Sequence, residues 1–135
     1  MTGLARRSEV QALESAMQGI DPVTDFAAST YHHFTDGVYM REVRRDADTV
    51  IVGKIHRYAC ANILLEGKVR IESEFEAGVY EAPCMWLSPA GNKRALYYME
   101  DSRFMTVHKN PTNTQDLKEL ESILIAESFK ALAGG

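Results

Sequence analysis

The stretch GKIHRYACANILLEG, residues 53–67, indicates the kind of fold that this chain adopts. Its apolar and polar residues alternate with the period of two that is typical of β-strands, and the GluGly pair at 66–67 supplies a turn signal. His56 lies in this run, and Lys54 precedes it by two positions. Alternation places both side chains on one face of the strand. The question is whether that face holds a metal-binding histidine or an ordinary buried one.

Composition places the chain among ordinary globular proteins of one domain. It has 135 residues, of which 45% are hydrophobic and 25% charged, and these values are typical of a single compact domain. The net charge of −4 argues against a nucleic-acid partner, since such proteins usually carry a basic surplus. No apolar run reaches the roughly 18 residues of a membrane span, and the N-terminal segment lacks the apolar core of a secretory signal.

The two cysteines, Cys60 and Cys84, both lie inside apolar runs. This placement favours buried, reduced thiols over a disulfide framework. We therefore expect a cytoplasmic protein with neither a nucleic-acid nor a membrane partner.

Period-two alternation begins at Val38 and continues to Lys109, interrupted by turn residues. Many short strands with short connections favour a β-sandwich or β-barrel. The alternation predicts eight strands, near residues 38–44, 49–56, 60–66, 68–74, 78–82, 84–88, 93–99 and 103–109.

Helical periodicity flanks this β region on both sides. Ser8 and Gln11 match a capping box that starts a helix, and Asp21-Pro22 ends it because proline cannot continue the helical hydrogen bonds. Residues 22–36 show no regular pattern, and a second helix follows Pro111. The apolar stripes of the two helices comprise Val10, Leu13, Met17 and Ile20 in the first and Leu117, Leu120 and Leu124 in the second.

Residues 36–109 resemble the cupin superfamily of small jelly-roll barrels, which has two signature blocks. The first block, G-x5-H-x-H-x3-E-x6-G, aligns on Gly67, although its opening glycine falls on Asp48. The second, G-x5-P-x-G-x2-H-x3-N, aligns on Pro89 and Gly91, although its asparagine falls on Tyr98. The resemblance implies an all-β, cupin-like jelly-roll β-barrel with an N-terminal and a C-terminal α-helix. In this single domain, the helix and an irregular arm occupy 1–36, the barrel 37–110 and the C-terminal helix 111–135.

The whole chain is also similar to a group of small cupin-like proteins of bacteriophages and prophages. This resemblance implies a viral or prophage protein that acts in the host cytoplasm, and cupin barrels frequently pair through their sheets, which implies a homodimer. The matching stretches are HHF (32–34), GKIH (53–56), PAGNKR (89–94) and TVH (106–108).

A metallocupin holds its ion with about three imidazoles and a carboxylate. In this chain the corresponding positions are Lys54, His56, Cys60 and Arg94. A lysine ammonium repels a divalent cation, and an arginine guanidinium never acts as a ligand. A lone histidine and cysteine fall short of a site. We therefore predict that the barrel uses no metal and no other cofactor.

The same substitutions predict a cationic pocket, because arginine offers a planar fork suited to carboxylate or phosphate and lysine a point charge. We call the alignment to the two cupin blocks, combined with strand alternation, the block register. It places two groups of side chains in the barrel interior, Lys54, His56, Cys60, Asn62 and Leu64 from the first block and Arg94, Leu96 and Tyr98 from the second. The leading hypothesis is a binding module for a small anionic, nucleotide- or sugar-phosphate-like ligand, or for a host or viral protein. The expected ligand-binding residues are Lys54, His56, Asn62, Arg94 and Tyr98.

A structural role for the cations is an equally open interpretation. Buried cations are usually paired with carboxylates. Glu42, Glu72 or Glu74 on neighbouring strands could form an internal ion pair with Arg94 or Lys54 that serves only the fold.

The enzymatic alternative is a metal-independent isomerase or epimerase acting on a sugar-nucleotide-like substrate. Its candidate base is His56 or His108, since histidine titrates near neutral pH, and its candidate acid is Tyr98 or Tyr97. Such an enzyme needs an acidic residue that orients the imidazole, and the spacing identifies none. We therefore favour a non-enzymatic protein.

Overall fold

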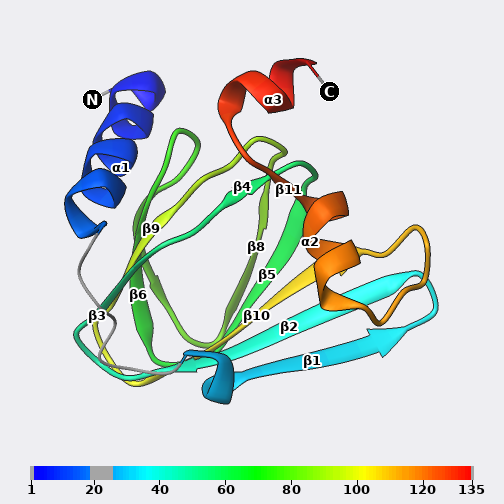
Figure 1. Ribbon diagram of the computed structural model, residues 1–135. Coiled ribbons are helices and arrows are strands. Elements are labelled where there is room, and N and C mark those ends of the chain that lie inside the picture. Colours follow the sequence, from blue (N-terminus) through cyan, green and yellow to red (C-terminus); the bar gives the residue numbers. More distant parts are fainter. Residues whose placement is uncertain (1, 19–25, 135) are drawn as a thin grey trace.

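The computed structural model describes residues 2–18 and 26–134, and its β-strands form two main antiparallel sheets that face each other in a jelly-roll (Figure 1). The larger sheet contains β1 (Thr30–Thr35), β2 (Val38–Arg45), β5 (Cys60–Glu66), β8 (Cys84–Ser88) and β10 (Ser102–Lys109). The smaller contains β3 (Thr49–Val52), β6 (Lys68–Glu72), β7 (Ala77–Glu81) and β9 (Ala95–Tyr98). Their strand orders are β1-β2-β10-β5-β8 and β3-β9-β6-β7.

Helices lie at the N- and C-terminal ends of this β-structure. α1 (Gly3–Met17) lies beside the smaller sheet, and α2 (Leu117–Leu124) covers one end of the barrel (Figure 1). A short strand after α2, β11 (Ile125–Ala126), pairs with β4 (Ile55–His56). A 3-10 helix (Phe26–Ser29) and α3 (Phe129–Gly134) complete the described elements. None of the helices described is long and apolar enough to cross a membrane.

The strand predictions are confirmed except at two places. The single strand expected at 49–56 is two strands, β3 and β4, separated at Gly53 and Lys54. Residues 30–35, expected to be irregular, form β1 and pair with β2 along their whole length. β1 is the edge strand of its sheet and is mostly exposed on both faces. Its sequence therefore lacks the alternation by which a half-buried strand is recognised.

The helix boundaries also differ from the predictions. Thr2, and not Ser8, is the N-cap of α1, because its side-chain oxygen accepts a hydrogen bond of 3.0 Å from the Ala5 amide. The predicted end at Asp21-Pro22, with Ile20, lies outside the described residues. The single C-terminal helix expected at 111–135 is interrupted after Leu124, because the next two residues extend to pair with β4.

The inner faces of the two sheets form the core, as the block register predicts. The positions expected inside on β5 and β9 are all buried, including the polar residues Asn62 and Arg94. A second apolar cluster, built on Tyr39, Leu120 and Leu124, attaches α2 to the barrel. Cys60 and Cys84 are free thiols, as expected. The main core cluster comprises Val43, Leu64, Val69, Ile71, Leu96, Tyr98 and Phe104.

The first cupin block keeps its backbone shape even where its sequence departs from the pattern. Asp48 stands at the position of the block's opening glycine and adopts φ +65°, a left-handed conformation that aspartate tolerates better than most residues. Gly67 closes the block with φ +93°. A Cβ at Gly67 would lie 2.5 Å from the Asp101 carbonyl oxygen. Gly67 is therefore needed both for its conformation and for close contact with the chain before β10.

We expect Gly67→Ala to destabilise the fold by roughly 2–5 kcal/mol, because the left-handed conformation costs about 1–2 kcal/mol and overpacking adds to it. Gly37→Ala is the matched control, since Gly37 has φ +73° and no heavy atom near the position of its Cβ. Gly37→Ala should lose only the free energy of unfolding that the left-handed conformation costs, about 1–2 kcal/mol. Urea unfolding of both variants measures the difference, and equal losses would show that contact at Gly67 is unimportant.

Candidate functional site

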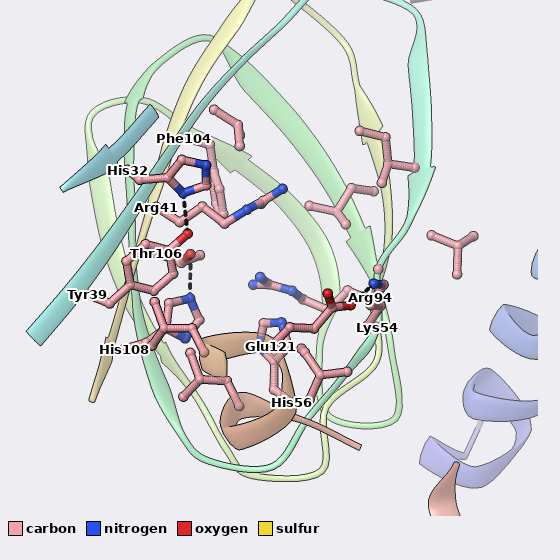
Figure 2. A pocket seen from close by; sticks show the side chains of 18 of the residues that line it. His32, Tyr39, Arg41, Lys54, His56, Arg94, Phe104, Thr106, His108 and Glu121 are labelled. Carbon is pink, nitrogen blue, oxygen red and sulfur yellow. Dashed lines mark hydrogen bonds and ion pairs between the residues drawn. The ribbon is translucent and has the colours of Figure 1, made fainter. Parts of the chain in front are cut away.

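A cavity of about 410 Å³ opens in the barrel beneath α2. Figure 2 shows charged and aromatic side chains pointing into it, from β1, β2 and β10 of the larger sheet and, across the cavity, from His56 and Arg94. Among the described residues, one carboxylate, Glu121, lines the cavity. Its cationic lining residues are Arg41, Arg45, Lys54 and Arg94, and its histidines are His32, His56 and His108.

Arg94 is the most deeply placed cation of the site predicted from sequence. Its side chain is 7% exposed, its Nη1 donates a hydrogen bond of 2.7 Å to Asn62 Oδ1, and its guanidinium lies 5.5 Å from the Phe104 ring centroid. Among the residues that the structure describes, no carboxylate lies within ion-pair distance of it. Because buried cations are usually paired, the unpaired guanidinium is the most unusual feature of the interior.

A chain of hydrogen bonds fixes Arg94 from behind. Asn62 Nδ2 donates to Ser88 Oγ at 2.8 Å, and Ser88 Oγ donates to Glu76 Oε1. Asn92 Nδ2 donates to the same carboxylate oxygen at 2.7 Å. Glu76 is itself only 6% exposed. The buried negative charge is thus connected to Arg94 through two neutral side chains and does not occupy the guanidinium directly.

β2 contributes two further arginines to the cavity. Arg41 and Arg45 alternate with Val43 and so share the inner face of the strand. Arg45 is 5% exposed and donates to Ser29 Oγ at 2.9 Å, while its Nε has no acceptor. Arg41 makes no hydrogen bond or ion pair within residues 2–18 and 26–134, and its guanidinium points into the cavity with that of Arg94 (Figure 2).

Lys54 lies at the rim of the cavity, not in its interior. Its Nζ forms an ion pair with Glu121 of α2 (Figure 2), and both side chains are more than half exposed. The Lys54–Glu121 pair therefore joins α2 to the break between β3 and β4. A surface pair of this kind contributes little to stability.

The internal ion pair proposed between Arg94 or Lys54 and Glu42, Glu72 or Glu74 is not present. These three glutamates pair with arginines elsewhere on the barrel and its flanking helix. The pairs are Glu42 with Arg103 at 2.6 Å, Glu72 with Arg70 at 3.3 Å and Glu74 with Arg7 at 3.8 Å. That alternative is therefore wrong for these glutamates, and the counter-charges are Glu121 for Lys54 and the more distant Glu76 for Arg94.

His56 and His108 lie together in the cavity wall, with ring centroids 5.5 Å apart in an edge-on arrangement. Burial, followed by the charge of Arg94, lowers the pKa of His56 to about 3 and that of His108 to about 4. Both imidazoles are therefore neutral near pH 7. His56 Nδ1 lies 3.8 Å from Cys60 Sγ, and His108 Nε2 lies 2.8 Å from Thr106 Oγ1.

Neither candidate base has the orienting acid that the isomerase hypothesis requires. In the described part of the chain, neither His56 nor His108 contacts a carboxylate. Tyr98 lines the cavity, and burial raises the pKa of its hydroxyl, which stays protonated. Tyr97 lies outside the cavity and bonds Asp48 at 2.5 Å. The site therefore offers neutral hydrogen-bonding groups around a guanidinium and lacks a poised acid–base pair.

Asn62, expected to contact the ligand, has no exposed surface. It bonds Arg94, Ser88 and the Trp86 carbonyl oxygen. The structure thus places Asn62 behind Arg94, where it fixes the guanidinium.

A metal of the metallocupin type does not fit the residues at its usual position. His56, Cys60 and His108 form a group whose ligand atoms lie within 4.8 Å of one another. Burial, however, raises the pKa of the Cys60 thiol, and only a thiolate is a strong ligand. Arg94 stands where the fourth ligand would be and repels a cation. The absence of a metal remains a prediction.

Sequence reasoning missed Arg41, Arg45, Glu76 and Glu121. The two arginines had a usable signal, because alternation through Tyr39 and Val43 places them on the face of β2 that lines the cavity, where Arg45 is buried and Arg41 stays exposed. Glu76 lies in a predicted turn, and Glu121 meets Lys54 across 67 positions of sequence. Neither contact leaves a local pattern in the sequence.

Acidification should destabilise the protein through the two buried histidines. Between about pH 6.5 and pH 4 the unfolded chain binds protons at these imidazoles and the folded chain does not. The free energy of unfolding should therefore fall as pH is lowered through this range, by about 1 kcal/mol per pH unit for each histidine. Urea unfolding between pH 5 and 6.5 measures the slope. His108→Gln should reduce it by about half, and an unchanged slope would contradict the assignment.

Comparisons with known proteins show the fold but no named family. No protein-family model matches the sequence, and no curated protein matches it. Among similar solved structures, a cupin-2 domain containing protein from Shewanella frigidimarina is 11% identical, with a TM-score of 0.51, covering 73% of this chain and 92% of that one. KdgF from a Halomonas species is 16% identical, with a TM-score of 0.52 and coverages of 70% and 85%.

Ectoine synthase from P. lautus is a third similar structure, 16% identical, with a TM-score of 0.52 and coverages of 67% and 78%. At such identities the likeness concerns the fold alone. The strand orders, the block register and these neighbours agree, and the chain has the cupin jelly-roll fold.

Proposed function

We propose that this protein is a binding module whose barrel cavity holds a small anionic molecule. The observation that supports the proposal is the buried guanidinium of Arg94, which faces the cavity without a carboxylate partner in the described part of the chain. A buried charge left without a partner is costly. A bound anion would supply that partner, and the fork of arginine suits carboxylate or phosphate.

The charge of the whole cavity supports the same proposal. Among the residues that the structure describes, four cationic side chains and one carboxylate line it, although the protein as a whole carries −4. Since Glu121 is paired with Lys54, the uncompensated cations are the arginines. A cleft lined by one sign of charge concentrates ligands of the opposite sign. The cavity volume of about 410 Å³ lies within the usual range for small-molecule sites.

The neutral groups around Arg94 support binding more than catalysis. His56, His108 and Tyr98 can each donate or accept a hydrogen bond without adding charge. The homodimer, the phage origin and the host or viral protein partner expected from the resemblance remain predictions.

Anion binding can be measured as thermal stabilisation, because a ligand that binds only the folded state raises its stability. We expect at least one of benzoate, phosphate and glucose 1-phosphate to raise the melting temperature at constant ionic strength. Arg94→Lys keeps the charge but loses the fork, and Arg41→Ala removes a cation that holds no protein partner among residues 2–18 and 26–134. Each should weaken binding about tenfold, the value of one charge-assisted hydrogen bond.

Arg70→Lys is the matched control for Arg94→Lys, and Arg70→Ala is the matched control for Arg41→Ala. Arg70 is an exposed arginine on β6, paired with Glu72 outside the cavity, so each control changes the net charge by the same amount as its cavity variant. Both controls should leave the stabilisation by anions unchanged. The proposal fails if no anion stabilises the wild-type protein, or if the Arg94 and Arg41 variants respond to anions as their Arg70 controls do.

A further inference from the structure

The cavity has an apolar side as well as a cationic one. α2 places three leucines, at helical spacing, over the opening. Leu120 and Leu124 are buried against Tyr39, while Leu117 remains 45% exposed at the rim. Apolar residues from β3, β9 and β10 continue this lining inside the barrel, and they are Ile51, Leu96 and Phe104.

The guanidiniums of Arg94 and Arg41 both point into the interior of the cavity (Figure 2). His56 and His108 line the same cavity, with ring centroids 5.5 Å apart. The groups that can hold an anion therefore lie in the interior of the barrel, beneath α2. A ligand that fills the cavity would meet this region with its polar end and the leucines of α2 with the remainder.

The cavity adds no helix N-terminus with free amides to its arginines, as many phosphate sites do. The helix N-terminus nearest the cavity belongs to α2, where Asp116 accepts hydrogen bonds from the amides of Lys118 and Glu119. A second anion is disfavoured there, because the capping carboxylate already takes the free amides. Sugar hydroxyls packed against the leucines would lack partners, and each unsatisfied hydroxyl costs binding free energy.

We propose that the ligand is a monocarboxylate with a compact apolar body, aliphatic or aromatic. Its carboxylate would bond Arg94 and Arg41, and its body would lie under Leu117, Leu120 and Leu124 of α2. This inference rests on the proposed anion-binding function and narrows it. It replaces the nucleotide- or sugar-phosphate-like ligand expected from sequence with one whose body needs no hydrogen bonds.

A matched series of six-membered rings tests the inference by calorimetric titration at constant pH and ionic strength. Cyclohexanecarboxylate has the carboxylate and an apolar ring, glucuronate has the same carboxylate on a ring with hydroxyls, and cyclohexylmethanol has the apolar ring without charge. We expect cyclohexanecarboxylate to bind at least about tenfold more tightly than either of the others. The hydroxyls of glucuronate would lose their hydrogen bonds to water, and cyclohexylmethanol would leave the arginines without a counter-charge. Glucose 1-phosphate should also bind more weakly.

Two variants locate the apolar body. Leu117→Asn makes the rim polar without disturbing a buried residue, and it should weaken cyclohexanecarboxylate about threefold to tenfold while leaving glucuronate unchanged. Leu4→Asn is its control, because Leu4 is also an exposed leucine in the first turn of a helix, 63% exposed on α1, and does not line the cavity. It should bind cyclohexanecarboxylate as the wild type does.

The outcomes separate this inference from the function on which it rests. If glucuronate or glucose 1-phosphate binds as tightly as cyclohexanecarboxylate and Arg94→Lys weakens it, the apolar ligand is wrong and the anion site stands. If cyclohexylmethanol binds equally well, the carboxylate has no role and the inference fails. If none of the four compounds binds and no anion stabilises the protein, both proposals fail.

Discussion

The connection from Arg94 through Asn62 and Ser88 to Glu76 is the constraint on which the interior depends. It keeps a positive and a negative charge inside one small barrel without letting them meet. A direct pair would have filled the fork of the guanidinium and neutralised it. Because two neutral side chains stand between the charges, Arg94 is held from behind while its remaining N–H groups face the cavity. The unpaired guanidinium in the cavity is therefore a consequence of how the core satisfies Glu76.

A buried network of charged and polar groups lowers the free energy of unfolding relative to a well-packed apolar core. Replacing buried charged groups by well-packed apolar residues is often neutral or stabilising, and a partly satisfied network is less favourable than none. This barrel carries two buried arginines, Arg45 and Arg94, together with the buried carboxylate of Glu76. Natural proteins depart from local consistency mainly at functional sites. The unpaired edge of Arg94 faces the cavity, and this location favours a role in binding over a role in folding.

The sequence could predict the parts of this structure that leave a periodic or motif signal. The half-buried strands β5 and β9 alternate clearly, and the block register correctly predicts that Asn62 and Arg94 lie inside the barrel. β1 could not be found this way, because an edge strand with both faces exposed has no buried face to impose alternation. Glu76 was also out of reach, since its role arises only when the turn that contains it packs beside Ser88 and Asn92.

The site has the position of a metallocupin centre and the opposite charge. Metal ligands must present lone pairs to a cation, whereas Lys54 and Arg94 present N–H groups. Lys54 is neutralised by Glu121 at the rim, so the unbalanced charge is concentrated on the arginines. Burial, and after it the charge of Arg94, lowers the pKa of the nearby imidazoles and keeps them neutral. The cations are covalently fixed and the histidines do not titrate near neutral pH, so the anion binding that we propose requires neither a metal nor a proton.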